Sequence, residues 1–139
     1  MTNVKAEYNT GVFDSNVVLN VVKENTTIIT GTQKTAIEVN GKIIAVYDIS
    51  FLVDNQKVQP NGTVNISLPI PAEYVGKPIK LIHIKADGSI ENVTVTVNNG
   101  FAEFVANSFS NYVITENSPN SPNTSDAGIL FVGPALFAL

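Results

Sequence analysis

The single histidine of the chain, His83, is the side chain best suited to acid–base chemistry near neutral pH. In a nucleophilic triad a histidine lies between a serine and a carboxylate, which the fold brings together. In the segment KPIKLIHIKADG, His83 shares one face of a predicted strand with Ile79 and Leu81. Nothing in the spacing of the serines and acidic residues directs a nucleophile to it. We therefore expect a structural role, with the ring partly covered and one nitrogen in contact with water.

The acidic residues could recruit a cation or act in pairs. No alternating run typical of a calcium loop is present among the aspartates, which are Asp14, Asp48, Asp54, Asp87 and Asp126. Asp87 precedes a glycine and is explained as part of a turn. Calcium held between loops stays open as an alternative. Glycoside hydrolysis needs two carboxyl groups facing each other across a cleft, which spacing along the chain does not reveal.

Aromatic platforms for sugars are few. The chain has no tryptophan, and its tyrosines are Tyr8, Tyr47, Tyr74 and Tyr112. Two of them, Tyr47 and Tyr112, lie in alternating segments and are expected in the core or at its rim. The residues thus suggest no constellation for chemistry, and we predict neither an enzyme nor a bound metal or cofactor.

The overall composition indicates one extracellular β domain. The chain has 139 residues, of which 44% are hydrophobic and only 14% are charged, whereas about a quarter are charged in an average globular protein. This length suits one domain with its own core. A formal net charge of −4 and the absence of lysine runs argue against nucleic acid or an anionic membrane as partner. There is no cysteine, which excludes disulfides and thiolate sites.

Hydrophobic and polar residues alternate in several segments, as half-buried strands require. Residues 63–71 (TVNISLPIP) place four aliphatic side chains on one face, and the prolines at the end of this segment predict that the strand stops there. Residues 45–54 (AVYDISFLVD) and 92–100 (NVTVTVNNG) show the same alternation. Each of the three segments is therefore predicted to form one strand.

Residues that tolerate positive φ separate the predicted strands. They occur at Asn40-Gly41 (between TAIEV and KIIAVYDIS), Asn61-Gly62, Asp87-Gly88 and Asn98-Asn99-Gly100. Helical turns are expected only near residues 30–35 or 71–76. About eight to ten short strands predict an all-β fold, a single antiparallel, immunoglobulin-like β-sandwich over residues 1–116 with a flexible tail after it.

The tail differs from the body. Residues 117–126 (NSPNSPNTSD) have the composition of a semi-extended linker. Residues 127–139 carry no charge and contain Pro134; as a helix they would reach about 20 Å, short of the roughly 30 Å of a bilayer core. Three interpretations stay open: a membrane segment that the sequence cuts short, which we favour, a strand that returns to the domain, or a disordered end.

Residues 46–116 contain a series of motifs: YDIS, VQPNG, NISLPIPAEY, HIKADGSI and NSFSNYV. In this order they resemble a β-sandwich module that recurs in large surface proteins of Gram-positive bacteria. The resemblance covers about half the chain and implies an exported protein. Members of this type carry a histidine before the Phe-Ser of the last strand, where this chain has Ser108. The polar role of that histidine therefore does not carry over.

The same resemblance gives the tail a meaning. Surface proteins of this class end in a sorting signal, and the segment at its expected place is Ser121, Pro122, Asn123, Thr124 and Ser125. The proline and threonine match the signal, while Ser121 and Ser125 replace its usual leucine and glycine. The resemblance implies that a sorting transpeptidase attacks the carbonyl of Thr124 with its thiolate and links the parent protein to the cell wall.

Surface domains of this kind also contain, in some cases, an amide cross-link between lysine and asparagine beside a buried carboxylate. The resemblance makes Lys5 with Asn111, and Asp48 as the carboxylate, the set to test. Export further predicts a signal upstream, since residues 1–13 lack the basic and apolar regions of a signal peptide.

These expectations converge on a non-catalytic, monomeric module of a bacterial surface protein. We predict that it acts as an extracellular spacer or stalk close to the wall anchor. The alternative is an adhesin-type module that binds a glycan or a host protein through the loops at one end of the sandwich.

Overall fold

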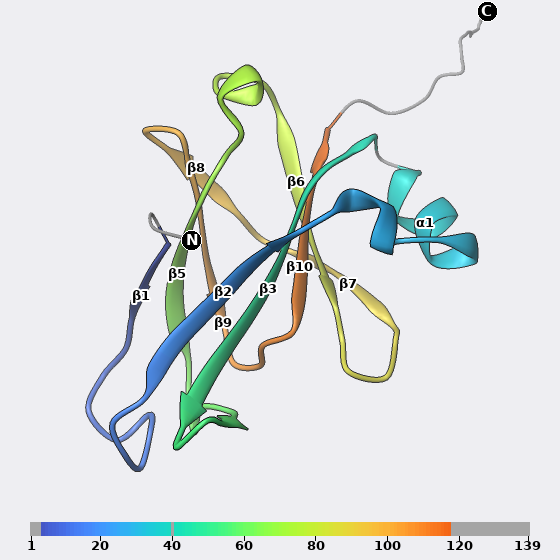
Figure 1. Ribbon diagram of the computed structural model, residues 1–139. Coiled ribbons are helices and arrows are strands. Elements are labelled where there is room, and N and C mark those ends of the chain that lie inside the picture. Colours follow the sequence, from blue (N-terminus) through green and yellow to red (C-terminus); the bar gives the residue numbers. More distant parts are fainter. Residues whose placement is uncertain (1–3, 40, 118–139) are drawn as a thin grey trace, which may run out of the picture.

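The chain folds into two antiparallel β-sheets packed as a sandwich, which confirms the predicted fold class (Figure 1). The computed structural model describes residues 4–39 and 41–117. The smaller sheet contains, in spatial order, β1 (Lys5–Glu7), β5 (Val64–Pro69), β9 (Phe101–Ala106) and β8 (Thr96–Asn98). The larger sheet contains β2 (Val18–Glu24), β3 (Ile43–Val53), β10 (Asn111–Glu116), β6 (Ile79–Ile84) and β7 (Ile90–Val93), and β4 (Gln56–Val58) pairs with the end of β3.

Strand β5 is the clearest case in which the sequence pattern becomes structure. The alternating aliphatic side chains of β5, and that of Ile70 directly after it, are all buried, with exposed fractions of 5% or less for Val64, Ile66, Leu68 and Ile70. The strand ends at Pro69, as predicted. Proline has no N–H to donate to a neighbouring strand, so the ladder cannot continue through it unchanged.

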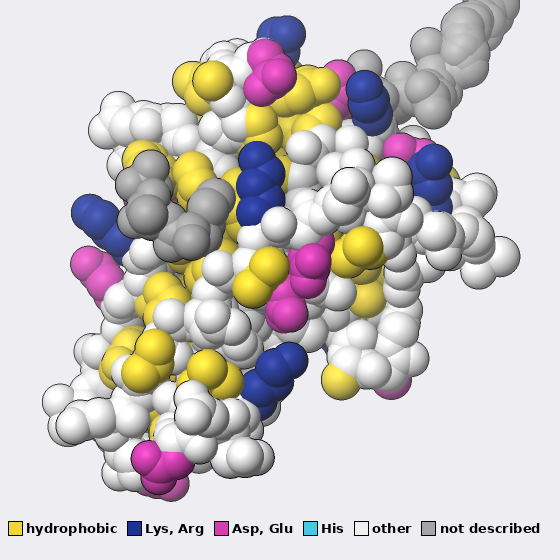
Figure 2. Space-filling view, in the orientation of Figure 1, with side chains coloured by type: hydrophobic (Ala, Val, Ile, Leu, Met, Phe, Trp, Pro, Cys, Tyr) yellow, Lys and Arg dark blue, Asp and Glu magenta, His cyan; other side chains and the backbone are white. Residues whose placement is uncertain are grey.

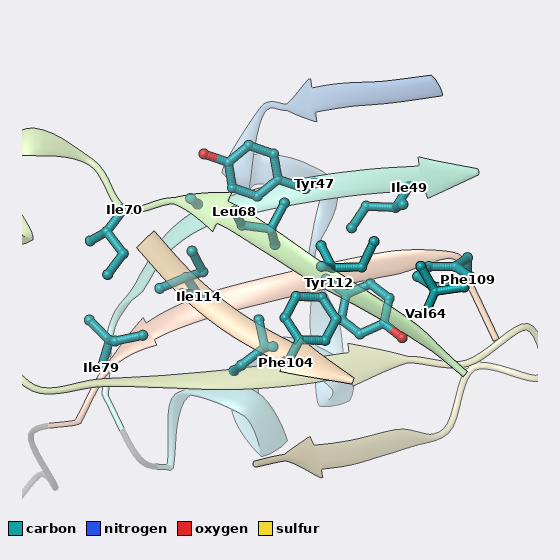
Figure 3. Close-up of a cluster of buried hydrophobic side chains, with 14 of the residues drawn as sticks. Tyr47, Ile49, Val64, Leu68, Ile70, Ile79, Phe104, Phe109, Tyr112 and Ile114 are labelled. Atoms are coloured by element: carbon teal, nitrogen blue, oxygen red, sulfur yellow. The ribbon is translucent and has the colours of Figure 1, made fainter. Parts of the chain in front are cut away.

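The main core lies between the two sheets and is rich in aromatic rings. Figure 3 shows Tyr47, Phe104, Phe109 and Tyr112 packed among aliphatic side chains from both sheets. The hydroxyl of Tyr47 on β3 donates a hydrogen bond to the carbonyl oxygen of Pro69 on β5 at 3.0 Å, which ties one sheet to the other. Tyr47 and Tyr112 are each 1% exposed, so their prediction as core residues is confirmed.

The prediction of one strand over residues 92–100 is wrong. The chain leaves the larger sheet after β7 and enters the smaller sheet at β8, so the alternating segment spans two strands that belong to different sheets. The alternating pattern is present in spite of this change of sheet because Val93 and Val95 both pack on the main core. Val97, the next valine in the pattern, is 47% exposed. A period of two is thus compatible with a change of sheet.

The predicted strand at TAIEV is also wrong, because most of it belongs to the helix α1 (Gly31–Glu38). This helix and the shorter turns η1 (Thr26–Ile28) and η2 (Ala72–Tyr74) lie in or next to the two regions where helical turns were expected. Ile37 of α1 is fully buried on the outer face of the larger sheet. There it forms a second core with Ile29, which directly follows η1, and with side chains of the sheet, namely Ile43, Val46, Ile82, Ile84 and Val113.

Two of the predicted hairpins have the expected backbone. Gly88 in the turn between β6 and β7 has φ +87°, and Asn99 and Gly100 between β8 and β9 have φ 51° and 83°. A further turn that the sequence analysis did not single out joins β3 to β4, where Asp54 and Asn55 have φ 50° and 64°. Paired positive φ values suit the twist of antiparallel strands.

Both ends of the described chain lie in the same half of the sandwich (Figure 1). Lys5 at the start of β1 pairs with Ser67, near the end of β5, and Glu116 at the end of β10 pairs with Ile79, at the start of β6. Residues 70–78 join the end of β5 to the start of β6, so they mark this half of the molecule. The chain therefore enters β1 from this end and leaves β10 toward it. The loops that follow β1, β3, β6 and β9 lie at the opposite end.

Candidate binding groove

A groove of about 880 Å³ opens where the smaller sheet is incomplete. Strand β8 pairs with only the first half of β9, from Phe101 to Glu103. Beyond that point the chain has crossed to the other sheet, and no strand of the described residues pairs with Phe104–Ala106 on this side. The groove is lined both by this half of β9 and by the crossing segment, residues 93–96, of which Val93, Thr94 and Thr96 reach it.

The floor of the groove continues onto the outer, polar face of the smaller sheet. The pairing register places four polar side chains in one row across its strands, namely Lys5, Ser67, Glu103 and Thr96. They point outward because their neighbours on β5, Ile66 and Leu68, point into the core. The hydroxyl of Ser67 lies 3.5 Å from a carboxylate oxygen of Glu103. Glu7 and Asn65 form the next row.

The wall of the groove contains His83 and Glu91. Pairing of β6 with β7 and β10 places His83 directly between Glu91 and Tyr112. The imidazole is 3% exposed, and its Nδ1 lies 3.8 Å from Oε1 of Glu91. On its other side, Nε2 lies 2.8 Å from Oγ of Ser110. The ring is thus covered more completely than expected, while Nδ1 is left without a hydrogen-bond partner among the described residues and faces the half-exposed carboxylate at the groove.

Ser110, His83 and Glu91 have the residue types of a catalytic triad, and the geometry favours a structural role for them. The Ser110 hydroxyl donates its one proton to the carbonyl oxygen of Ile84 at 2.6 Å. His83 Nε2 must then donate to Ser110 Oγ, which leaves Nδ1 without a proton. A triad needs the opposite tautomer, in which Nε2 accepts the proton of the serine and the carboxylate holds an Nδ1 proton. The cluster therefore fastens β10 to β6.

Burial controls the charge of this cluster. Desolvation lowers the pKa of His83 below its usual value of 6.5, and Lys85 lowers it further, whereas the negative charge of Glu91 acts in the opposite direction. The imidazole is therefore neutral at pH 7. Burial also raises the pKa of the Tyr112 phenol, whose hydroxyl donates to the carbonyl oxygen of Ser108 at 2.7 Å. Two neutral rings thus line the inner wall of the groove.

The set proposed for an amide cross-link is not brought together. Asn111 and Asp48 are direct partners across β10 and β3. Their side chains point to the outer face of the larger sheet, since Tyr47 and Tyr112 beside them point inward. Lys5 is exposed on the outer face of the smaller sheet. The lysine and its intended partners therefore lie on opposite faces of the sandwich, and Lys5 belongs to the groove floor instead.

The sorting-like residues Ser121, Pro122, Asn123, Thr124 and Ser125 lie outside the described residues, as do Asp126 and the apolar tail at 127–139. No helix among residues 4–39 and 41–117 is long and apolar enough to cross a membrane.

The other described aspartates do not share a common hydrogen-bond partner. Asp14 accepts a hydrogen bond from the Asn61 amide at 3.1 Å, and Asp54 lies in the β3–β4 turn. Asp87 accepts hydrogen bonds from the backbone and hydroxyl of Ser89, which lower its pKa. Within the described part of the chain no three His, Asp or Glu side chains are grouped to hold a metal.

A smaller hollow of about 420 Å³ lies among the loops at the end opposite the chain ends. Its lining comes from the β1–β2 loop and the region around β4, including Phe13, Asp14, Val58 and Asn61. Tyr8, 44% exposed, packs edge-on against Phe13 close by. The sequence predicts binding loops at one end of the sandwich and does not specify which end.

Sequence reasoning missed Glu91, Glu103 and Ser110 as groove and cluster residues. For Glu91 a signal was present: a hairpin centred on Asp87 places residue 91 opposite His83. Glu103 and the incomplete β8 offered no such signal, because they depend on the change of sheet.

No protein-family model matches the chain, and no curated protein matches it.

Proposed function

We propose that the chain is a non-catalytic module of a Gram-positive bacterial surface protein, exposed outside the cell, and that it binds a ligand. The motifs in residues 46–116 and the low-charge, cysteine-free composition support the first part. The orientation of the Ser110–His83–Glu91 cluster supports a role without catalysis, since the serine proton is already engaged.

The path of the chain is the observation that favours a binding module over a spacer. A spacer that extends a stalk in series needs the chain to enter at one end and leave at the other. Here the chain enters β1 and leaves β10 in the same half of the sandwich (Figure 1). This geometry favours a unit that stands out from the line of the parent protein. The loops at the opposite end then face away from the point of attachment, and the groove opens along the side of the sandwich, from β1 to β9.

The visible surface supports a selective partner more than a nonspecific anionic one. Figure 2 shows one face of the molecule, on which lysines and acidic side chains are interspersed and no large area of positive charge is formed. Binding to nucleic acid or an anionic membrane relies on such an area. A site made of a few placed polar groups, as in the groove, fits a specific ligand better.

Surface exposure is tested by labelling intact cells that make the parent protein with a membrane-impermeant, amine-reactive reagent. Lys5 and Lys57, both exposed, should be modified in intact cells. Labelling of these lysines only after lysis would exclude an extracellular location.

Binding is tested with cells that display the module and are allowed to adhere to immobilised host matrix proteins or mucin glycans. The double variant Glu91→Gln, Glu103→Gln should reduce adherence severalfold, whereas Glu73→Gln, outside the groove, should leave it unchanged. Equal adherence of cells with and without the module would contradict a binding role and favour the spacer.

Wall anchoring through the tail is a separate part of the proposal. A sorting transpeptidase incubated with the full-length parent protein should cleave it after Thr124, and mass spectrometry of the fragments locates the cut. An intact parent protein, under conditions where a standard sorting substrate is cleaved, would rule this anchor out.

A further inference from the structure

We infer that the groove binds an extended peptide segment bearing lysine or arginine, by adding it as a strand to the unpaired half of β9. This inference rests on the proposed binding role and names the ligand class for the groove. Three features of the site support it: an incomplete sheet, space beside it, and two hydrogen-bond acceptors to which no described residue donates.

The first feature is the sheet edge. On one side, β9 pairs along its whole length with β5. On the other side β8 stops opposite Glu103, so among the described residues Phe104–Ala106 have no strand partner there. In an antiparallel sheet, alternate residues direct both N–H and C=O toward the same neighbour. Backbone groups of this stretch therefore point into the groove and can pair with an added strand.

The second feature is room for that strand. The crossing segment, residues 93–96, turns away toward the other sheet and forms the far wall of the groove, while β9 forms the near wall. The groove as a whole, which includes the space between these walls and the floor on β1 and β5, has a volume of about 880 Å³, within the usual range for ligand sites. An added segment of three residues would extend about 10 Å along the edge.

The third feature sets the charge of the ligand. His83 Nδ1 carries no proton in the tautomer that Ser110 imposes, so it can only accept a hydrogen bond. Oε1 of Glu91 is another acceptor, and the two atoms are 3.8 Å apart. Lys85 lies 3.8 Å from the other carboxylate oxygen, Oε2. An ammonium or guanidinium group, which carries several N–H donors, can satisfy Nδ1 and Oε1 together.

The remaining charges in the groove agree with a cationic ligand. Glu103 and Glu7 add two carboxylates on the floor, and Lys5 on β1 is the one lysine among the lining residues. An anionic ligand would face three carboxylates. A neutral glycan would not neutralise the carboxylates, and Phe101 is the only aromatic lining residue that is not buried and could stack on a sugar.

Strand addition also predicts which positions of the ligand carry the basic side chains: every second residue, because alternate side chains of a strand point to the same face.

The full chain is titrated with three probes: the peptide acetyl-Thr-Lys-Thr-Lys-Thr-amide, its Glu-for-Lys counterpart, and the neutral sugar cellotetraose. Backbone amide signals and amide hydrogen exchange are followed by NMR. The lysine peptide should bind most tightly, shift signals of Phe104–Ala106 and residues 91–94, and slow exchange of one or more amides in Phe104–Ala106.

Glu91→Gln should weaken binding of the lysine peptide about fivefold or more, since it removes a charged acceptor, and Glu73→Gln should have no effect. Amide spectra of both variants verify that they are folded. The inference is overturned if the acidic peptide or the sugar binds equally well, if the lysine peptide binds without affecting Phe104–Ala106, or if no probe binds at millimolar concentration. The cell-adherence experiment judges the binding role itself, so failure of the peptide alone is distinguishable from failure of that role.

Discussion

The imidazole of His83 lies flat against the phenol ring of Tyr112, with ring centroids 4.2 Å apart and an interplanar angle of 1°. The two residues are direct partners across β6 and β10. Such a stack is compatible with a neutral imidazole buried in the core, and it places the one histidine of the chain where protonation is unfavourable.

The stability of the fold should therefore depend on pH through His83. Its pKa is about 6.5 when the chain is unfolded and lower when it is folded. The unfolded chain then binds more protons between the two values, so the free energy of unfolding falls as pH drops from about 6.5 through the folded pKa. One proton gives a slope of at most about 1.4 kcal/mol per pH unit.

The variant His83→Phe keeps a ring against Tyr112 and removes this titration. Urea unfolding of both proteins between pH 8 and pH 4.5 isolates the contribution of His83, because the carboxylates are common to both. The stability of the wild type relative to the variant should decrease below about pH 6.5. A difference that stays constant over this range would contradict a neutral, buried His83.

Thr115 should be a stabilising site. Its side chain is fully buried at 0% exposure, and none of the residues that the structure describes offers its hydroxyl a hydrogen-bond partner. A buried, unpaired hydroxyl is unfavourable by about 1–3 kcal/mol, so the nearly isosteric Thr115→Val is expected to raise the free energy of unfolding by about 1 kcal/mol. Urea unfolding at pH 7 measures the change, and the exposed Thr63→Val serves as control. Destabilisation by Thr115→Val would show that the hydroxyl is hydrogen bonded in solution.

The helix α1 should contribute to stability through one side chain. Ile37 is fully buried in the second core, whereas Val39, two residues further, is 65% exposed. Ile37→Ala should lower the free energy of unfolding by about 2–5 kcal/mol. Val39→Ala should change it by less than about 0.5 kcal/mol. Similar effects from both variants would mean that α1 does not pack on the sheet as described.

Gly41 should tolerate no side chain. A Cβ placed there would overlap the carbonyl oxygen of Glu116, and the φ of Gly41 is +149°. Gly11 also has a positive φ, +95°, but nothing lies within 4 Å of an added Cβ. Gly41→Ala should therefore destabilise the protein clearly more than Gly11→Ala, whose expected cost is about 1 kcal/mol of backbone strain. Thermal unfolding of the two variants compares them directly. Equal shifts in Tm would indicate that the end of β10 can move away.

Much of the fold could be predicted because its signals are local. The strand in residues 63–71 and its end at Pro69 follow from alternation and from the missing N–H of proline. The turn at Asp87-Gly88 follows from a glycine with positive φ. The buried tyrosines follow from the face of the strand on which they lie.

The errors arose where a local pattern has two structural solutions. Residues 92–100 keep their alternation while the chain passes from one sheet to the other, because both sheets bury valines in the same core. Short apolar runs such as TAIEV do not distinguish a strand from a helix. Packing of Ile37 against the outer face of the larger sheet decides between the two.

The groove could not be predicted for the same reason. Its floor depends on the register that aligns Lys5, Ser67 and Glu103 across three strands, and its mouth depends on the early end of β8. Neither feature can be inferred from a single segment of the sequence, because both depend on how separate strands pair. The extracellular location and the wall anchor are different in kind, since they come from resemblance and stay predictions.

The chain enters β1 and leaves β10 in the same half of the sandwich, and this path also determines how the domain would respond to mechanical force. Tension applied through its two ends would pull on β1 and β10 from one end of the sandwich, so the hydrogen bonds between β1 and β5 would be loaded one after another. Bonds that break in sequence yield at lower force than bonds sheared together. Under load β1 should detach first, so in the proposed surface protein this domain would act as an extensible element.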